Sequence, residues 1–300
     1  MLIRAATAKT NAPRRYDHIK AAPIAGTMGA EITGVDLRKL GDAAFSEIEQ
    51  ALADHLAIFI LDQDLSVEEL EAFTQRFGAF GADPFIEGMK DHPHVLHVRK
   101  EANEMAPVVF GGLWHSDWSF LEKPPAYTIL HAKEIPPYGG DTLYANGYLA
   151  YESLSDEMKR VLCSLTALHS AERGYGAQMQ NIYAFLENMS VKTGGDASTR
   201  VQEHPLVRTH PVTKRKTLYV NPVYTVGIKG MHPEEAAPIL AFLNDHMTHE
   251  NFTCRFRWSP GAVAMWDNRC CLHLPISDYL GFRREMYRTT VEGERPYLES

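Results

Sequence analysis

Apolar positions near the start of the chain recur with a helical period. Residues 45–56 place apolar side chains three and four positions apart, and an unbroken apolar run at 57–61 follows them. This pattern predicts a helix and then a buried strand. A second helix is predicted to begin after Ser66, because its hydroxyl can cap the helix while Glu69 completes a capping box. We therefore expect helices packed on the outside of a sheet.

From residue 127 onward the pattern changes to short apolar stretches separated by turn residues. Strands are predicted at 127–132, 142–145, 205–209, 217–220, 252–258, 262–266 and 286–291, with helices near 156–163 and 233–246. Opening strands with tight bends are expected within 20–36. Many short strands with long connections favour a mainly β fold with flanking helices, a double-stranded β-helix of the jelly-roll type. A ligand would then lie at the open end of the barrel.

The length of 300 residues suits one large core, so a single domain over 1–300 is expected. Residues 1–16 lack an apolar core and are expected to be flexible. Residues 174–204 stand apart because glycines bracket a few aromatic side chains. Since a loop of this length in a compact domain is usually functional, we interpret it as a lid over the active site; an ordinary surface insertion is the alternative.

The net charge of −8 limits the classes of partner that the chain can have. A nucleic-acid or anionic-membrane surface needs a positive field, so neither partner is expected. No apolar run approaches the length of a membrane-spanning helix. The four cysteines lack zinc-type spacing, and the neighbours Cys270 and Cys271 make a poor disulfide. Reduced thiols and a cytoplasmic location are expected.

The candidate chemistry begins with the pair His115 and Asp117 and a third residue, His273, far downstream. Side chains at i and i+2 on a strand or its end point to one side, so the pair can reach one metal ion. Two imidazoles and one carboxylate occupy one face of an octahedron and leave three positions open. This set is typical of non-haem Fe(II) oxygenases, in which a co-substrate and O2 must also bind.

A hydroxyl and a guanidinium accompany this set at Thr142 and Arg284. An arginine can hold a carboxylate in a bidentate fork, and a threonine hydroxyl can complete the recognition from the side. A dicarboxylic co-substrate would suit both residues. Because Arg283 precedes Arg284, the register of this arginine is open by one position.

Several motifs resemble, in order and spacing, the Fe(II)/2-oxoglutarate-dependent dioxygenases of the taurine dioxygenase and 2,4-dichlorophenoxyacetate dioxygenase (TauD/TfdA) family. They are Trp114-His115-Ser116-Asp117, Pro124-Pro125, Gly139-Gly140-Asp141-Thr142, Tyr219-Val220-Asn221-Pro222, residues 261–269 and the segment from His273 to Arg288. The resemblance runs from about residue 24 to 296 and implies the jelly-roll fold. It implies Fe(II), 2-oxoglutarate and O2 as cofactor and co-substrates, with iron on His115, Asp117 and His273 and 2-oxoglutarate on Thr142 and Arg284.

The resemblance also assigns Arg288 to the substrate, and its even spacing from Arg284 would turn both side chains inward on a strand. Tyr224 matches an aromatic pocket position of the taurine enzyme. Gly111, however, stands where that enzyme has a substrate-binding Asn, and residues 80–83 lack its substrate-contacting His, so taurine itself is not expected. Apolar side chains at 108–110 would suit a larger apolar or aromatic body.

The function expected from the resemblance is hydroxylation of a small anionic molecule, with release of succinate and CO2. An aryloxyalkanoate, an alkyl sulfate or a sulfonate would qualify, and C–O, C–S or C–N cleavage follows where the hydroxylated carbon bears a heteroatom. A desaturase or cyclase, a non-catalytic jelly-roll module that binds a metal or ligand, and a zinc hydrolase are the alternatives. A homodimer or homotetramer is expected from the family. Four aromatic side chains are interpreted as core or pocket walls: Trp114, Trp118, Phe120 and Trp266.

Overall fold

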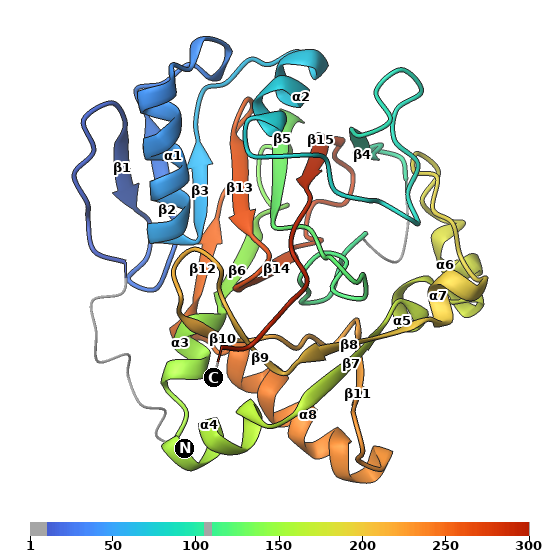
Figure 1. Ribbon diagram of the computed structural model, residues 1–300. Coiled ribbons are helices and arrows are strands. Elements are labelled where there is room, and N and C mark those ends of the chain that lie inside the picture. The colour runs from blue at the N-terminus through green and yellow to red at the C-terminus, as the bar shows by residue number, and fades with distance from the viewer. Residues whose placement is uncertain (1–10, 105–109, 300) are drawn as a thin grey trace.

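The computed structural model describes residues 11–104 and 110–299, and its largest element is a seven-stranded sheet (Figure 1). The strand order is β1-β2-β3-β13-β5-β15-β4, and all neighbours are antiparallel except β2 and β3. The strands of this main sheet are β1 (Lys20–Pro23), β2 (Ala30–Thr33), β3 (Ala57–Ile60), β4 (Leu96–Lys100), β5 (Tyr127–Glu134), β13 (Val263–Asp267) and β15 (Arg284–Val291).

A smaller sheet packs against the middle of the main sheet. Its order is β12-β6-β14, formed by β12 (Thr253–Phe256), β6 (Thr142–Asn146) and β14 (Cys271–Pro275). Aromatic side chains join the two layers: the Tyr144 ring lies 5.4 Å from that of Phe59 and 5.6 Å from that of Trp266. Two antiparallel layers around one apolar core make the predicted jelly roll.

The outer face of the main sheet is covered by helices α1 (Asp42–His55) and α2 (Val67–Gln75), and Figure 1 shows α1 lying across β2 and β3. Strand β3 is buried on both faces. Ile58 and Ile60 pack with the helices, whereas Phe59 points into the sandwich, because side chains alternate along a strand. The predicted capping box between Ser66 and Glu69 is present at the start of α2.

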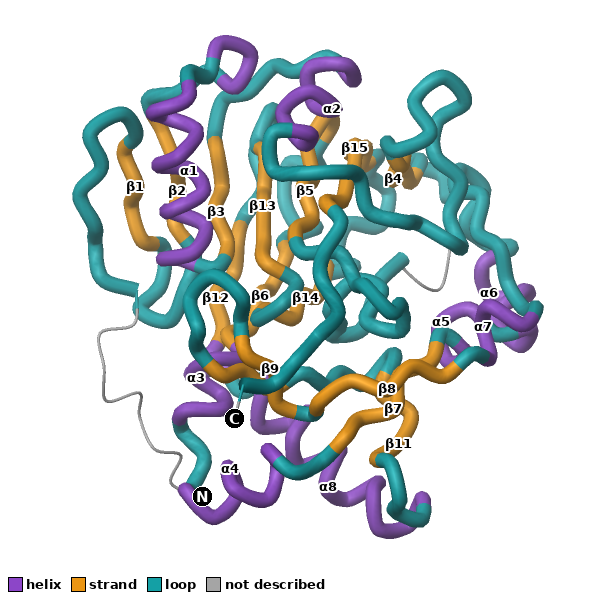
Figure 2. Tube along the Cα trace, viewed as in Figure 1, coloured by secondary structure: helices purple, strands orange, loops and turns teal. Residues whose placement is uncertain are grey.

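The remaining elements lie beside and below the sandwich (Figure 2). A three-stranded sheet has the order β11-β7-β8, and β9 pairs with β10. Their bounds are β7 (Thr166–Ser170), β8 (Val201–Pro205), β9 (Val207–Thr209), β10 (Lys216–Leu218) and β11 (Thr225–Ile228). The helices are α3 (Gly147–Glu152), α4 (Asp156–Cys163), α5 (Glu172–Tyr175), α6 (Gln180–Tyr183), α7 (Asp196–Thr199) and α8 (Pro233–Met247), with 3-10 turns η1 (Leu37–Lys39), η2 (Ala177–Met179) and η3 (Glu250–Phe252).

Some predicted segments are corrected by the structure. The strand expected at 205–209 is split between β8 and β9. Residues 201–204 of the expected lid belong to β8, which pairs with β7. In the expected flexible start, Asn11 is buried and donates to the carbonyl oxygens of Ala25 and Gly29; residues 1–10 lie outside the described part, and flexibility of this segment stays a prediction.

Two further expectations concern the cysteines and membrane-spanning helices. All four cysteines are free thiols. Within residues 11–104 and 110–299, no helix has the length and apolar character needed to cross a bilayer.

Candidate active site

The predicted donor set converges at one end of the small sheet. One ligand atom from each of His115, Asp117 and His273 lies within 4.8 Å of the other two, and all three residues are buried. An isolated antiparallel bridge brings the two histidines together, since the amide of His115 donates to the His273 carbonyl at 3.1 Å and the reverse bond is 2.8 Å. Asp117 follows in a turn, with Oδ1 3.5 Å from His115 Nε2. The i, i+2 pair thus lies at an isolated bridge followed by a turn, outside the named strands.

Each histidine of this set is prepared to offer a lone pair. His115 Nδ1 lies 2.7 Å from the carbonyl oxygen of Leu113, which can only accept, so Nδ1 carries the proton and Nε2 is free. Burial, reinforced by neighbouring His115, lowers the pKa of His273 well below its usual value. His273 is therefore a neutral donor at ordinary pH, the form that binds metal, and His115 directs Nε2 toward the same point.

Asp117 keeps its charge although it is buried. Burial raises the pKa of this carboxyl, but Arg288 and the two histidines more than offset it and hold the pKa well below its ordinary value. Oδ2 accepts from Thr128 Oγ1 at 2.6 Å and lies 2.9 Å from Arg288 Nη2. Because Oδ2 is occupied in this way, Oδ1 is the oxygen that faces His115.

Asn268 fixes this arrangement from behind. Its side-chain nitrogen donates to Thr128 Oγ1 at 2.8 Å, and its side-chain oxygen accepts from Trp266 Nε1 at 3.0 Å and from the amide of Asp117 at 3.2 Å. Asn268 lies within the family motif at 261–269, but its support of Asp117 was not predicted. Thr128 was not predicted at all, because nothing near it in the chain distinguishes it from any other strand threonine.

Trp118, directly after Asp117, has a left-handed backbone with φ of 44°. This conformation is costly for a bulky residue and persists only where the surroundings impose it. The indole Nε1 donates to Asp83 Oδ1 at 2.6 Å. The strained backbone therefore lies directly after the candidate ligand Asp117. It directs the Trp118 ring, predicted to be a core or pocket wall, toward the cavity described below.

Thr142 and Arg284 lie on neighbouring strand ends beside this set. Trp258 Nε1 donates to Thr142 Oγ1 at 3.0 Å, and the Arg284 guanidinium stands 5.8 Å from the centre of the Trp258 ring. Gly140, with φ of 70°, passes so close that a Cβ there would lie 3.4 Å from Arg284 Nε. Tyr144 interacts electrostatically with Arg284 and lies 6.4 Å, ring to ring, from His273. The two residues predicted for a dicarboxylate thus border the metal-ligand set.

Arg284 is a buried cation without a counter-ion. It has no acidic partner within the described residues, and its Nε is a buried donor with no hydrogen-bond partner there. Burial lowers the pKa of this guanidinium, the direction expected for an unpaired buried cation. Arg283 points the other way and forms ion pairs with Glu101, Glu134 and Glu285. The sequence left open which of the two arginines points inward. In the structure Arg284 is buried and Arg283 points outward.

A cavity of about 530 Å³ opens over His115 and Asp117. This volume falls within the range typical of small-molecule sites. Its wall is mostly apolar and aromatic, drawn from Phe110, Leu113, Trp118, Tyr175, Met179, Ile182, Tyr183, Pro222, Val223 and Tyr224. The segment interpreted as a lid supplies four of these residues, at 175–183. The predicted apolar residues 108 and 109 lie outside the described part of the chain.

Gly111 and Tyr224, both predicted near the substrate, border this cavity beside His115. A Cβ on Gly111, whose φ is 73°, would lie 3.1 Å from His115 Cε1, so the glycine allows the backbone to pass over the imidazole. The Tyr224 ring meets that of His115 edge to face at 6.2 Å. Arg288 is different: it lies between Asp117 and Asp83, 3.8 Å from the latter, and is not among the described residues that border the cavity.

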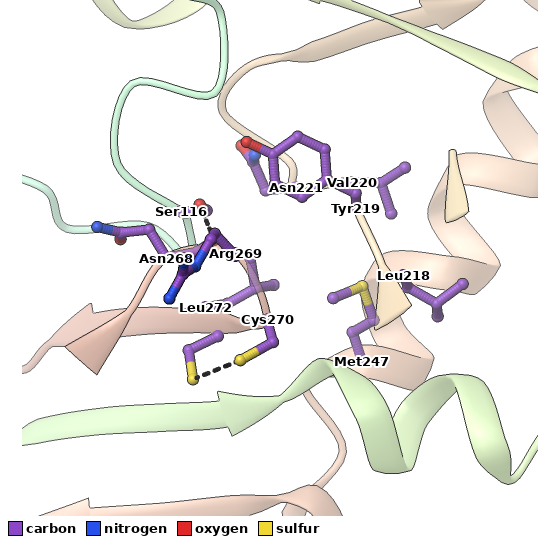
Figure 3. A pocket seen from close by; sticks show the side chains of 11 residues that line it. Ser116, Leu218, Tyr219, Val220, Asn221, Met247, Asn268, Arg269, Cys270 and Leu272 are labelled. Atoms are coloured by element: carbon purple, nitrogen blue, oxygen red, sulfur yellow. Dashed lines mark hydrogen bonds between the residues drawn. The ribbon is translucent and has the colours of Figure 1, made fainter. Parts of the chain in front are cut away.

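A second, much smaller space lies behind the Asp117 turn, between Ser116, Asn268 and Tyr219 (Figure 3). Its volume of about 10 Å³ is close to the space that one water molecule needs. The Ser116 hydroxyl beside it donates to the Asn268 carbonyl at 2.8 Å. The residues around this space support the Asp117 turn, and the space itself is too small for an organic ligand.

Comparison with known proteins agrees with this geometry. The family model described as taurine catabolism dioxygenase TauD, TfdA family matches residues 20–290. An alpha-ketoglutarate-dependent sulfate ester dioxygenase of Pseudomonas putida is 34% identical over 278 residues, 91% of this chain and 89% of that protein. An (S)-phenoxypropionate/alpha-ketoglutarate-dioxygenase of Sphingobium herbicidovorans is 27% identical over 277 residues, 91% and 94% of the two chains. The crystal structure of a taurine dioxygenase from Burkholderia xenovorans superposes with a TM-score of 0.78 at 34% identity, covering 93% of each chain. The chain belongs to the TauD/TfdA family of 2-oxoglutarate-dependent dioxygenases.

Proposed function

We propose that this dioxygenase holds Fe(II) on His115, Asp117 and His273 and binds 2-oxoglutarate through Thr142 and Arg284. With O2 it would hydroxylate a C–H bond of a small anionic molecule that carries an apolar or aromatic body, releasing succinate and CO2. Two imidazoles and one ionised carboxylate, of which His115 and Asp117 border the cavity, form a ligand set suited to a non-haem Fe(II) centre.

The observation that carries the proposal is the unpaired cation Arg284 beside this donor set. A buried guanidinium without a carboxylate is costly, so the fold keeps it for an anion that comes from outside. The Nε atom of Arg284 has no hydrogen-bond partner within the described residues. Two other buried polar atoms, His273 Nδ1 and the Tyr144 hydroxyl, also lack one there. A keto acid with two carboxylates would satisfy donors that the protein leaves open.

The chain's own residues would orient the reactants. Because Trp258 donates to Thr142 Oγ1, the threonine proton is free for a co-substrate carboxylate, and Arg284 can donate to the same group in a bidentate fork. Thr128 and Arg288 hold Asp117 Oδ2, so Oδ1 is presented to the metal. Bound iron with 2-oxoglutarate would supply the activation of O2. The aromatic wall would exclude water and hold the substrate C–H bond over the site.

The substrate class follows from the relatives and from the cavity. One relative is named for a sulfate ester and another for phenoxypropionate, both anions with an organic body. We propose that Tyr224 packs against that body and that Gly111 leaves room for it over His115. The family pattern predicts that Arg288 faces the substrate, and we propose that it acts there by positioning Asp117, with which it pairs at 2.9 Å. The homo-oligomeric state and the cytoplasmic location also stay predictions.

The test is an anaerobic titration of the purified chain with Fe(II) and then with 2-oxoglutarate, recorded in the visible range. A weak charge-transfer band of the chelated keto acid is expected. Arg284→Ala should need about 10- to 100-fold more 2-oxoglutarate for the same band, since a hydrogen bond to a charged group contributes about 1.5–3 kcal/mol. Arg283→Ala removes the same charge from the opposite face and should titrate like the parent. A folded parent protein without any band would contradict the proposal.

A further inference from the structure

The large cavity is bordered by a single fixed positive charge within the described residues. This charge is Arg173 in α5, in a wall that is otherwise mostly aromatic and apolar. Its Nη1 donates to the carbonyl oxygens of Thr225 at 2.9 Å and Pro222 at 3.3 Å. These two bonds hold the side chain in place without cancelling its charge, and within the described residues no carboxylate forms an ion pair with it.

The other cations near the site are already engaged. Arg284 is reserved, under the proposed function, for 2-oxoglutarate. Arg288 faces two carboxylates, with Asp117 at 2.9 Å and Asp83 at 3.8 Å, and its side chain is only 6% exposed. An incoming anion would therefore have to compete with these two carboxylates for the Arg288 guanidinium in a buried setting. Arg173 offers an exposed and unpaired guanidinium instead.

The aromatic wall links Arg173 to the reacting end of the cavity. Gly174, the next residue, passes Tyr224 so closely that a Cβ there would lie 3.3 Å from the Tyr224 ring. The Tyr224 ring also lies 6.2 Å, ring to ring, from that of His115. A ligand that spans this distance needs an apolar body on Tyr224 and an anionic group at Arg173.

We propose that Arg173 determines substrate specificity by binding the anionic group at the mouth of the cavity. The preferred substrate is then an amphipathic anion, with an apolar body between the charged group and the C–H bond that reacts. A compact anion would not reach both ends. This inference rests on the proposed function, because it takes His115 and Asp117 to mark the reacting end.

The test measures binding of octyl sulfate and of uncharged 1-octanol to the enzyme loaded with Mn(II) and N-oxalylglycine, by calorimetry. Arg173→Gln should weaken octyl sulfate binding about tenfold or more, since a charge-assisted hydrogen bond is lost. Arg173→Lys should retain most of the affinity. Binding of 1-octanol should be the same in all variants. Arg200→Gln is the matched control. It removes the same charge from an exposed position at the end of α7, and Arg200 does not border the cavity.

Several results would overturn the inference. These are octyl sulfate binding to Arg173→Gln as tightly as to the parent, an equal loss of affinity for both ligands, and no binding of octyl sulfate by the parent. The visible band with Fe(II) and 2-oxoglutarate distinguishes these failures from failure of the proposed function. The band should be unchanged in Arg173→Gln, and only its absence from the parent protein would contradict the iron and 2-oxoglutarate assignment.

Discussion

Two buried clusters in this chain look alike as lists of metal-binding residues. The first, the proposed iron cluster, is His115, Asp117 and His273. The second, the Asp267 cluster, is His210, Asp267 and Cys270; in each, the candidate ligand atoms lie within 4.8 Å of one another. Residue types and spacing in space therefore do not separate a metal site from a structural cluster.

Hydrogen bonding separates them. Both oxygens of Asp267 are taken by Arg269, at 2.8 and 2.6 Å, and His210 Nε2 adds a contact at 2.9 Å. His210 Nδ1 accepts from the amides of Val212 and Thr213, so its proton is on Nε2 and points at the carboxylate. Asp117 by contrast has only Oδ2 engaged in this way, and a cavity lies over the cluster. A metal site needs lone pairs that the protein leaves free.

The largest effect is expected from Asp267→Asn. This change removes the nearer counter-ion of buried Arg269 and leaves only Glu294 at 3.7 Å, which should lower the free energy of unfolding by about 3 kcal/mol, the low end for a broken buried pair. Chemical denaturation measures the loss. Metal binding per folded molecule should not change, because Asp267 is not a ligand. A loss of Fe(II) stoichiometry in the folded variant would mean that the Asp267 cluster does bind metal.

Removal of a proposed iron ligand comes next. His115→Ala and His273→Ala should each weaken Fe(II) binding by at least about 100-fold, since loss of even an outer partner of a ligand costs 10- to 100-fold. Anaerobic calorimetry on variants shown to be folded measures this. His210→Ala is the matched control and should keep the parent affinity. Full Fe(II) affinity in the first two variants would contradict the assignment.

A third buried cluster, the pair His169 and His204, sharpens the comparison, because within the described residues these histidines contact a hydroxyl and a carbonyl and no carboxylate. Burial lowers the pKa of His169 to about 3 and that of His204 to about 4. Both pKa values lie below that of an unfolded histidine, so stability is full above pH 6.5 and falls as the pH drops toward the folded values. Between pH 7 and pH 5 each should cost about 2 kcal/mol of unfolding free energy, from 1.36 kcal/mol per pH unit.

Denaturation across this pH range measures the slope, and His169→Gln supplies the comparison. The variant should lose the share of the slope that belongs to His169. An identical slope in parent and variant would show that His169 accepts its proton in the folded state as readily as in the unfolded one.

The smallest effect is expected from Thr128→Val. The variant removes the hydroxyl that donates to Asp117 Oδ2 and leaves Arg288 as its partner, so the carboxylate should lose orientation but keep its charge. Fe(II) affinity should fall by about tenfold, the lower end expected for a partner of a ligand. Thr128→Ser restores the hydroxyl and should restore the affinity. An unaffected Thr128→Val variant would mean that Arg288 alone holds the carboxylate.

Local patterns in the sequence predicted much of the scaffold. The bounds of α4 agree with the expected 156–163, and α8 differs from 233–246 by one residue at its end. Strands β4, β7, β11 and β14 were not predicted. These strands are short and carry polar or small residues, so their extended state depends on the partner strands and not on their own composition. His273 lies on β14, so the sequence identified the candidate ligand but not the strand that carries it.

The sequence by itself determined the residue types, the i, i+2 spacing of His115 and Asp117, and the presence of an arginine near 284. These are local properties or family motifs. Only the tertiary structure decided that Arg284 turns inward and Arg283 outward, that Thr128 and Asn268 support Asp117, and that Arg288 faces Asp83 while Arg173 borders the cavity. The contacts involved range from 11 positions apart, for Thr128 and Asp117, to 205, for Arg288 and Asp83, and they follow from strand register and packing, which no local pattern encodes.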